Sequence, residues 1–408
     1  MRKRCVLMVI GVMVNVMVFA QTSKEARPLN EFSFGLYDEL KKEHENVFFS
    51  PLSTYLSLGI LSDGAAGSTK HQLDSILGLG RKVGLDKVRD AVDEMVSRGV
   101  GDGKIRLANG CWVDHSIKLK KQFLNNYSER PYSSVKMVDM SEPKSVVDGV
   151  NAWANKTTEG TIPNLLSASA ITPQTRMLLC NSLYMNLPWE YGFKPRSTFE
   201  NTFTDKNKVE TRLKFMFKMG YMEYAYEKKF HMVIRNLGEG NQALCVVVPK
   251  SGYSLEEVEE EMTSKKLSQL MRRTYDQLIG LSLPKFSMEG EYDFKQPLKK
   301  MGADKMFGLK ADFSEMTANQ NLLVESVRQK VKIDVNEKRI VATAVTVVRM
   351  GEMSAVGMPD PEEPLYISAD HPFMFFIIDK PTNGVYFMGR YVVPSESDIV
   401  SNNENGSE

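Results

Sequence analysis

Cysteine is scarce in this sequence. The chain has 408 residues but only four Cys, and one of them, Cys5, lies in the N-terminal segment. The other three, Cys111, Cys180 and Cys245, each lie in an apolar, strand-like context. An odd number of thiols in such surroundings predicts buried free cysteines rather than a disulfide framework or a metal site. We therefore expect the hydrophobic core alone to hold the fold together.

Motifs of catalytic and metal-binding sites are missing as well. The five histidines occur in unrelated contexts without the spacing of metal ligands, and the chain has no Gly-x-Ser-x-Gly motif and no phosphate-cradling glycine loop. A hydrolytic site needs a nucleophile, a base and an orienting group, or a cluster of metal ligands. The sequence therefore predicts a protein that is not an enzyme and that has no metal or cofactor.

The chain also lacks an excess of charge of either sign, with 52 basic and 51 acidic residues. Removal of Arg2, Lys3 and Arg4 with the N-terminal segment would leave 49 basic residues against 51 acidic ones. This balance predicts no nucleic acid or other polyanion as a partner.

The first twenty residues have the pattern of a secretory signal. A basic start, Arg2 to Arg4, precedes the apolar run Val6–Phe19 and a small-residue cleavage site that ends at Ala20. The run is too short for a membrane span. We expect residues 1–20 to be a signal peptide and the protein to be exported: extracellular, or periplasmic if its source is bacterial, and not membrane-bound after signal removal.

The remainder has no low-complexity linker, which predicts one domain over residues 21–394. Helical periodicity is expected over Pro28–Glu45 and, as a single helix, over Leu255–Arg273. The apolar run Met177–Tyr184 is typical of a strand covered on both faces. The polar residues 395–408 predict a disordered tail.

The segment Asp334–Ser354 is the most informative part of the chain. A strand pattern ends at Val335, and a charged break, Glu337 to Arg339, follows it. An extended, β-branched run resumes after this break. If it forms a strand, one of its faces carries no charge and has mainly small side chains in its first half: Ile340, Ala342, Ala344, Thr346 and Val348. The pattern indicates a strand that becomes buried beneath crowded neighbours.

Glu337, Ala342, Ala344 and Thr346 have the spacing of the hinge of serpins, the loop-inserting protease inhibitors, and Ala369–Ile377 is similar to that family's signature. The chain resembles serpins over about residues 28–394. The resemblance implies an α+β serpin fold with a large mixed, mainly antiparallel central sheet A, two further sheets, eight to nine helices and an exposed reactive-centre loop. It also implies that Glu337, Arg339, Ile340, Ala342, Ala344 and Thr346 form the hinge.

The same resemblance implies a shutter beneath the point where the central sheet opens. It assigns Ser50, Ser53, Asn181 and Gln329 to this place, with Gln329 where the family frequently has His. Read without the resemblance, Ser50 and Ser53 are two hydroxyl groups at the start of a helix.

In the family, the residue before the cleaved bond lies sixteen positions after the hinge Glu, which gives Met353, with Ser354 after the bond. An unbranched, uncharged Met suits the apolar pocket of elastase-like or chymotrypsin-like proteases. Arg349 would suit a trypsin-like pocket but lies four residues earlier. The resemblance thus implies a monomeric inhibitor whose partner is a serine endopeptidase, held in a covalent complex.

The segment after Glu337 departs from the family pattern: Arg339, Ile340 and Val341 stand where Gly, Thr and Glu are usual, and Thr343 stands where Ala is usual. Arg339 lacks the conformational freedom with which Gly would ease the entry of the loop into the sheet. Two alternatives therefore stay open: a non-inhibitory carrier or chaperone-like serpin, and a cross-class inhibitor of papain-like cysteine proteases.

Overall fold

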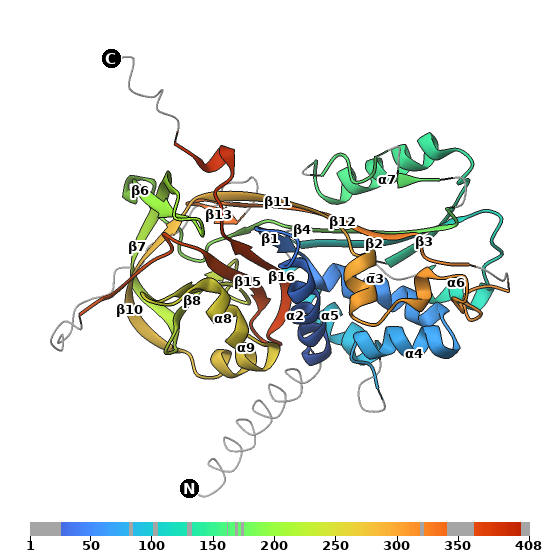
Figure 1. The fold of residues 1–408 in the computed structure, drawn as a ribbon, viewed down its shortest axis with the longest axis horizontal. Helices are drawn as coiled ribbons and strands as arrows, with labels where there is room; N and C mark the ends of the chain where they lie inside the picture. Colours follow the sequence, from blue (N-terminus) through green and yellow to red (C-terminus); the bar gives the residue numbers. More distant parts are fainter. Residues whose placement is uncertain are drawn as a thin grey trace, which may run out of the picture.

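The computed structural model describes residues 26–80, 85–100, 105–128, 133–160, 162–167, 170–172, 175–318, 322–340 and 363–400. In these residues a central sheet is covered by helices on both faces and joins a second, strand-rich region (Figure 1). The helices are α2 (Arg27–Leu40), α3 (Pro51–Gly64), α4 (Gly67–Ile76), α5 (Leu85–Val100), α6 (Lys121–Ser128), α7 (Pro143–Thr157), α8 (Leu255–Glu261), α9 (Ser264–Met271) and α10 (Lys295–Lys300). No helix among the described residues is long and apolar enough to cross a membrane.

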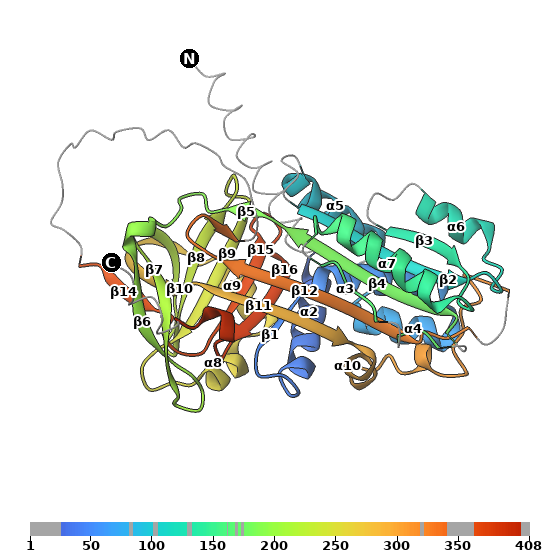
Figure 2. The same cartoon turned by 90° about the horizontal axis from the view of Figure 1, so that it is seen from above.

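The central sheet lies between α7 on one face and α2, α3 and α4 on the other (Figures 1 and 2). Its strand order is β3 (Ser133–Val138), β2 (Ile105–Asp114), β4 (Met177–Met185), β12 (Ser326–Val335), β13 (Arg339–Ile340) and β5 (Leu187–Pro188), and β11 (Phe286–Asp293) also pairs with β12. Strand β4 is parallel to β12, whereas β13 is antiparallel to both of its neighbours.

The second region contains β1 (Val47–Phe49), β16 (Gly384–Tyr391), β15 (Phe373–Asp379), β9 (Gln242–Pro249), β8 (Phe230–Leu237), β7 (Glu210–Tyr226), β10 (Tyr275–Pro284) and β14 (Leu365–Ser368), with β6 (Thr198–Thr204) beside β7. The long strand β7 pairs with β8 near one end and with β10 over most of its length, so the two further sheets share a continuous ladder. The predicted α+β class with a large mixed central sheet is confirmed.

Apolar strand runs form the core. Every residue of β9, β15 and β16 is buried, and the Phe48 ring of β1 stacks on Phe387 with a centroid distance of 5.2 Å. Cys111, Cys180 and Cys245 are buried free thiols, as the sequence predicts. Burial raises the pKa of the Cys111 thiol to about 12.

Two sequence predictions differ from the structure. Residues 255–271 form two helices instead of one, because Thr263 adopts an extended conformation and its side chain caps α9 by accepting a hydrogen bond from the Lys266 amide (3.1 Å). The predicted tail is ordered over residues 395–400, because the Asp398 carboxylate accepts hydrogen bonds from Tyr391 Oη (2.8 Å) and the Ser287 amide (2.8 Å). Residues 401–408 lie outside the described residues.

Candidate functional site

The charged break after β12 forms a tight turn. The Asn336 side-chain oxygen accepts hydrogen bonds from the Lys338 (3.1 Å) and Arg339 (3.3 Å) amides, and the Asn336 amide donates to the Arg339 carbonyl (3.1 Å). The chain then reverses, so that Ile340 pairs with Val335 on one side and with Leu187 on the other. Arg339 occupies an extended strand position, where the positive φ that would require Gly is not needed.

Glu337 is anchored at this turn. Its carboxylate accepts a hydrogen bond from Thr198 Oγ1 (2.9 Å) and pairs with Lys285 Nζ (3.1 Å), and its side chain is only 13% exposed. Burial acts to raise the pKa of Glu337, but these hydrogen bonds and the lysine charge outweigh it and lower the pKa. The negative charge therefore holds the beginning of the loop against β6 and the end of β10.

The central sheet is incompletely paired next to the turn. Strands β4 and β12 form a parallel ladder at residues 178–181 and 326–329; among the described residues, this ladder ends at Asn181 and Gln329, although both strands continue. A cavity of about 20 Å³ lies beyond this point. Its lining includes Leu183 and Met185 of β4, Ile333 of β12 and Ile340 of β13, which was predicted to belong to the hinge.

Polar side chains occupy the place where the two strands do pair. Gln329 Oε1 accepts a hydrogen bond from the Ser50 amide (2.8 Å), while Gln329 Nε2 donates to the Ser50 carbonyl (2.9 Å) and to Thr54 Oγ1 (3.2 Å). Ser50 also caps α3, since its hydroxyl oxygen accepts a hydrogen bond from the Ser53 amide (3.3 Å). Gln329 thus joins β12 to the start of α3.

Asn181 extends this cluster to β4 and β2. Ser53 Oγ donates to the Asn109 side-chain oxygen (3.1 Å), Ser57 Oγ contacts the side-chain oxygens of both Asn109 and Asn181, and Asn181 lies opposite Asn109 in the β2–β4 ladder. The structure therefore brings together all four residues predicted for the shutter. Sequence reasoning missed Thr54, Ser57 and Asn109; the helical spacing of residues 50, 53, 54 and 57 was the available signal.

The remaining predicted site residues, Ala342, Ala344, Thr346, Met353 and Ser354, lie outside the described residues. Their roles as hinge residues and as the reactive bond stay predictions.

The comparison with known families identifies the same family that the sequence resembles. The family model described as "Serpin (serine protease inhibitor)" matches residues 27–394. The chain belongs to the serpin family.

Individual serpins are similar over nearly the whole chain. Serpin I2 from Homo sapiens is 26% identical over 92% of this chain and 93% of its own length. The leukocyte elastase inhibitor from Bos taurus is 28% identical over 86% of this chain and 93% of its own length. The crystal structure of human thyroxine-binding globulin complexed with thyroxine superposes with a TM-score of 0.80 at 25% identity, and the match covers 92% of this chain and 100% of that one.

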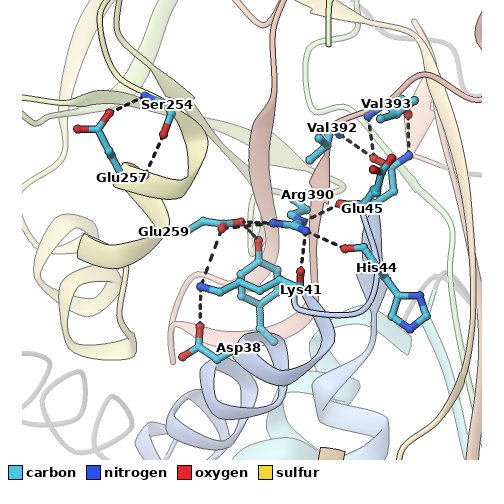
Figure 3. A network of polar contacts seen from close by, with 12 residues as sticks. Asp38, Lys41, His44, Glu45, Ser254, Glu257, Glu259, Arg390, Val392 and Val393 are labelled. Atoms are coloured by element: carbon cyan, nitrogen blue, oxygen red, sulfur yellow. Dashed lines mark hydrogen bonds and ion pairs between the residues drawn. The ribbon is translucent and has the colours of Figure 1, made fainter. Parts of the chain in front are cut away.

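A second polar network of this serpin, shown in Figure 3, ties together α2, α8 and β16. The Arg390 guanidinium donates to the carbonyls of Lys41 (2.9 Å) and His44 (2.7 Å) and pairs with the buried carboxylate of Glu259 (3.4 Å). Tyr37 Oη donates to the same carboxylate. Since the two buried charges compensate each other, we assign this network a structural role.

Proposed function

We propose that this serpin inhibits serine endopeptidases by suicide cleavage, covalent trapping and insertion of its cleaved loop. The unpaired stretch between β4 and β12 carries the proposal. Ile340 already pairs with Val335 beside this stretch, so the residues that follow it start from a position next to the unfilled part of the sheet.

Strand addition supplies the driving force, and serpin loop insertion is a known example of it. A protease that attacks the loop forms its usual acyl-enzyme, and cleavage frees the loop to enter the sheet. Residues 340–353 would span about 46 Å at ~3.3 Å each. At ~1 kcal/mol per residue, insertion gains on the order of 10 kcal/mol. This is enough to distort a catalytic site whose rate depends on sub-ångström placement, so deacylation stops.

Target specificity follows from the proposed reactive bond Met353–Ser354. An unbranched apolar side chain suits elastase-like and chymotrypsin-like pockets. The name of the bovine relative, leukocyte elastase inhibitor, supports the first of these. We also propose that the protein is exported, in line with its N-terminal signal pattern, and that it acts as a monomer.

Incubation with elastase-like, chymotrypsin-like and trypsin-like proteases, followed by denaturing electrophoresis, tests the proposal. We expect a covalent band with the first two classes and a released C-terminal fragment that begins at Ser354. Complete cleavage by every protease without such a band would contradict inhibition.

A carrier function is the second candidate, because the similar thyroxine-binding globulin is, by its name, a binding protein. Cleavage without trapping would favour it. A papain-like cysteine protease belongs in the same panel, since a band with this enzyme alone would favour cross-class inhibition.

A further inference from the structure

A buried arginine lies behind the segment that holds the base of the loop. Arg235 of β8 is 6% exposed. Its Nη2 atom donates to the Tyr191 carbonyl (2.6 Å), and its guanidinium carbon lies 5.8 Å from the Trp189 ring and 5.4 Å from the Phe193 ring. Its Nε atom is buried and has no hydrogen-bond partner among the described residues.

The segment consists of residues 187–193. On its other side it contacts residues 336–338 of the turn after β12, which we call the loop base. Trp189 Nε1 donates to the Asn336 carbonyl (2.7 Å) and the Trp189 amide to the Lys338 carbonyl (3.2 Å). The Phe193 amide donates to the Glu337 carbonyl (2.9 Å). The two rings pack edge to face with centroids 5.3 Å apart. The rings of Trp189 and Phe193 therefore contact Arg235, while the Trp189 indole and the backbone amides of both residues hold the three consecutive carbonyls of residues 336–338.

A buried cation without a hydrogen-bonded carboxylate is unfavourable in itself. Desolvation lowers the pKa of Arg235 to about 10. The nearby Glu190 carboxylate accepts its hydrogen bond from Asn236 Nδ2 (2.8 Å) instead. Arg235 is instead stabilised by cation–π contacts with Trp189 and Phe193 and by its hydrogen bond to the Tyr191 carbonyl. These interactions position residues 189–193.

We propose that Arg235 is a positioning residue for loop insertion: it holds Trp189 and Phe193 against the carbonyls of residues 336–338 and so restrains the loop base until cleavage. This inference rests on the proposed function, because it names what controls insertion. It predicts that loss of the guanidinium releases the loop base without weakening the core.

Hydrogen exchange on the full chain tests the proposal without any protease. We expect Arg235→Met to accelerate exchange of the Trp189, Phe193 and Arg339 amides by tenfold or more, while the amides of β15 and β16 keep their wild-type rates. Arg235→Lys keeps a cation over the rings and should restore most of the protection. Arg212→Met, a change at an exposed arginine paired with Glu200 (3.1 Å), is the matched control and should change nothing.

Wild-type exchange at these three amides in Arg235→Met would overturn the inference. An equal acceleration throughout β15 and β16 would also overturn it, because it would show general destabilisation. If wild-type protein forms covalent complexes, Arg235→Met should in addition lose inhibitory capacity several-fold faster on storage, as the uncleaved loop inserts. Failure of the proposed function would appear separately, as a wild-type chain that forms no complex but has the expected exchange pattern.

Discussion

At the scale of single residues, one ion pair anchors the turn at residues 336–339, from which the loop begins. Glu337 is nearly buried and paired with Lys285, although nothing near it in the sequence indicates that partner. Its depressed pKa means that the carboxylate stabilises the fold above its unfolded pKa of about 4.5 and that this contribution is lost as the pH falls through the lower folded value.

We predict that Glu337→Gln lowers the free energy of unfolding by about 1–2 kcal/mol at neutral pH, since Lys285 is partly exposed and the ion pair is partly screened. The difference from wild type should disappear in acid. Urea unfolding at several pH values measures it, and a double-mutant cycle with Lys285→Met isolates the pair. If Glu337→Gln remained equally less stable than the wild type below pH 3, the electrostatic explanation would be refuted.

His371 should give a pH dependence of opposite sign. Its ring nitrogens face Asp370 Oδ1 (2.8 Å) and the Pro249 carbonyl (3.0 Å). Burial acts to lower the pKa of His371, but these acceptors outweigh burial and raise it above 6.5. The stabilisation is therefore complete below pH 6.5 and is lost as the pH rises through the folded pKa.

Because the imidazole is about one-third exposed, we expect at most ~1 kcal/mol from it. In the wild type, the loss of this contribution should lower the free energy of unfolding between pH 6 and 9. His371→Gln should not show this decrease, and urea unfolding at several pH values measures the difference. If the free energy of unfolding decreased equally with pH in the variant and in the wild type, His371 would not be the group responsible.

At the scale of elements, Gln329 is the contact through which β12 reaches α3. We predict that Gln329→Ala lowers the free energy of unfolding by about 2–3 kcal/mol, because the buried amide of Ser50 loses its acceptor and the Ser50 carbonyl keeps only the hydrogen bonds from Thr54. Chemical denaturation measures the change. Gln122→Ala, at an exposed position of α6, is the control and should stay within ~0.5 kcal/mol of wild type.

Strand β13 should decide between trapping and simple cleavage. Ile340 is 2% exposed at the edge of the unfilled stretch. Ile340→Glu would place a charge at this buried position, directly before the residues that are proposed to insert, so we expect the protease to cleave the variant without forming a covalent band. Lys338→Glu, at an exposed turn position, should leave trapping intact. A normal yield of complex from Ile340→Glu would mean that insertion does not begin at this residue.

At the scale of the whole molecule, the proposed function requires the unpaired stretch between β4 and β12 to accept one more strand after cleavage. Cleavage in the loop should therefore raise the melting temperature by ~10 °C or more, because insertion adds backbone hydrogen bonds and burial. Calorimetry of nicked and intact protein measures this shift. Nicked Ile340→Glu should melt close to its intact form, and equal melting of the two wild-type forms would exclude a metastable native state.

Local patterns in the sequence determined much of this protein: the buried thiols, the apolar strands and the break at residues 337–339 all depend on neighbours along the chain. The helix break at Thr263 and the ordered residues 395–400 were missed, because a cap and a docking contact depend on what lies nearby in space.

Only the tertiary structure decided which distant residues meet. Gln329 with Ser50, Glu337 with Lys285, and Trp189 between Arg235 and the carbonyl of Asn336 are each set by strand register and side-chain packing. Periodicity places a side chain on a face, but the partner across that face is chosen by the three-dimensional arrangement of elements that are far apart in the chain.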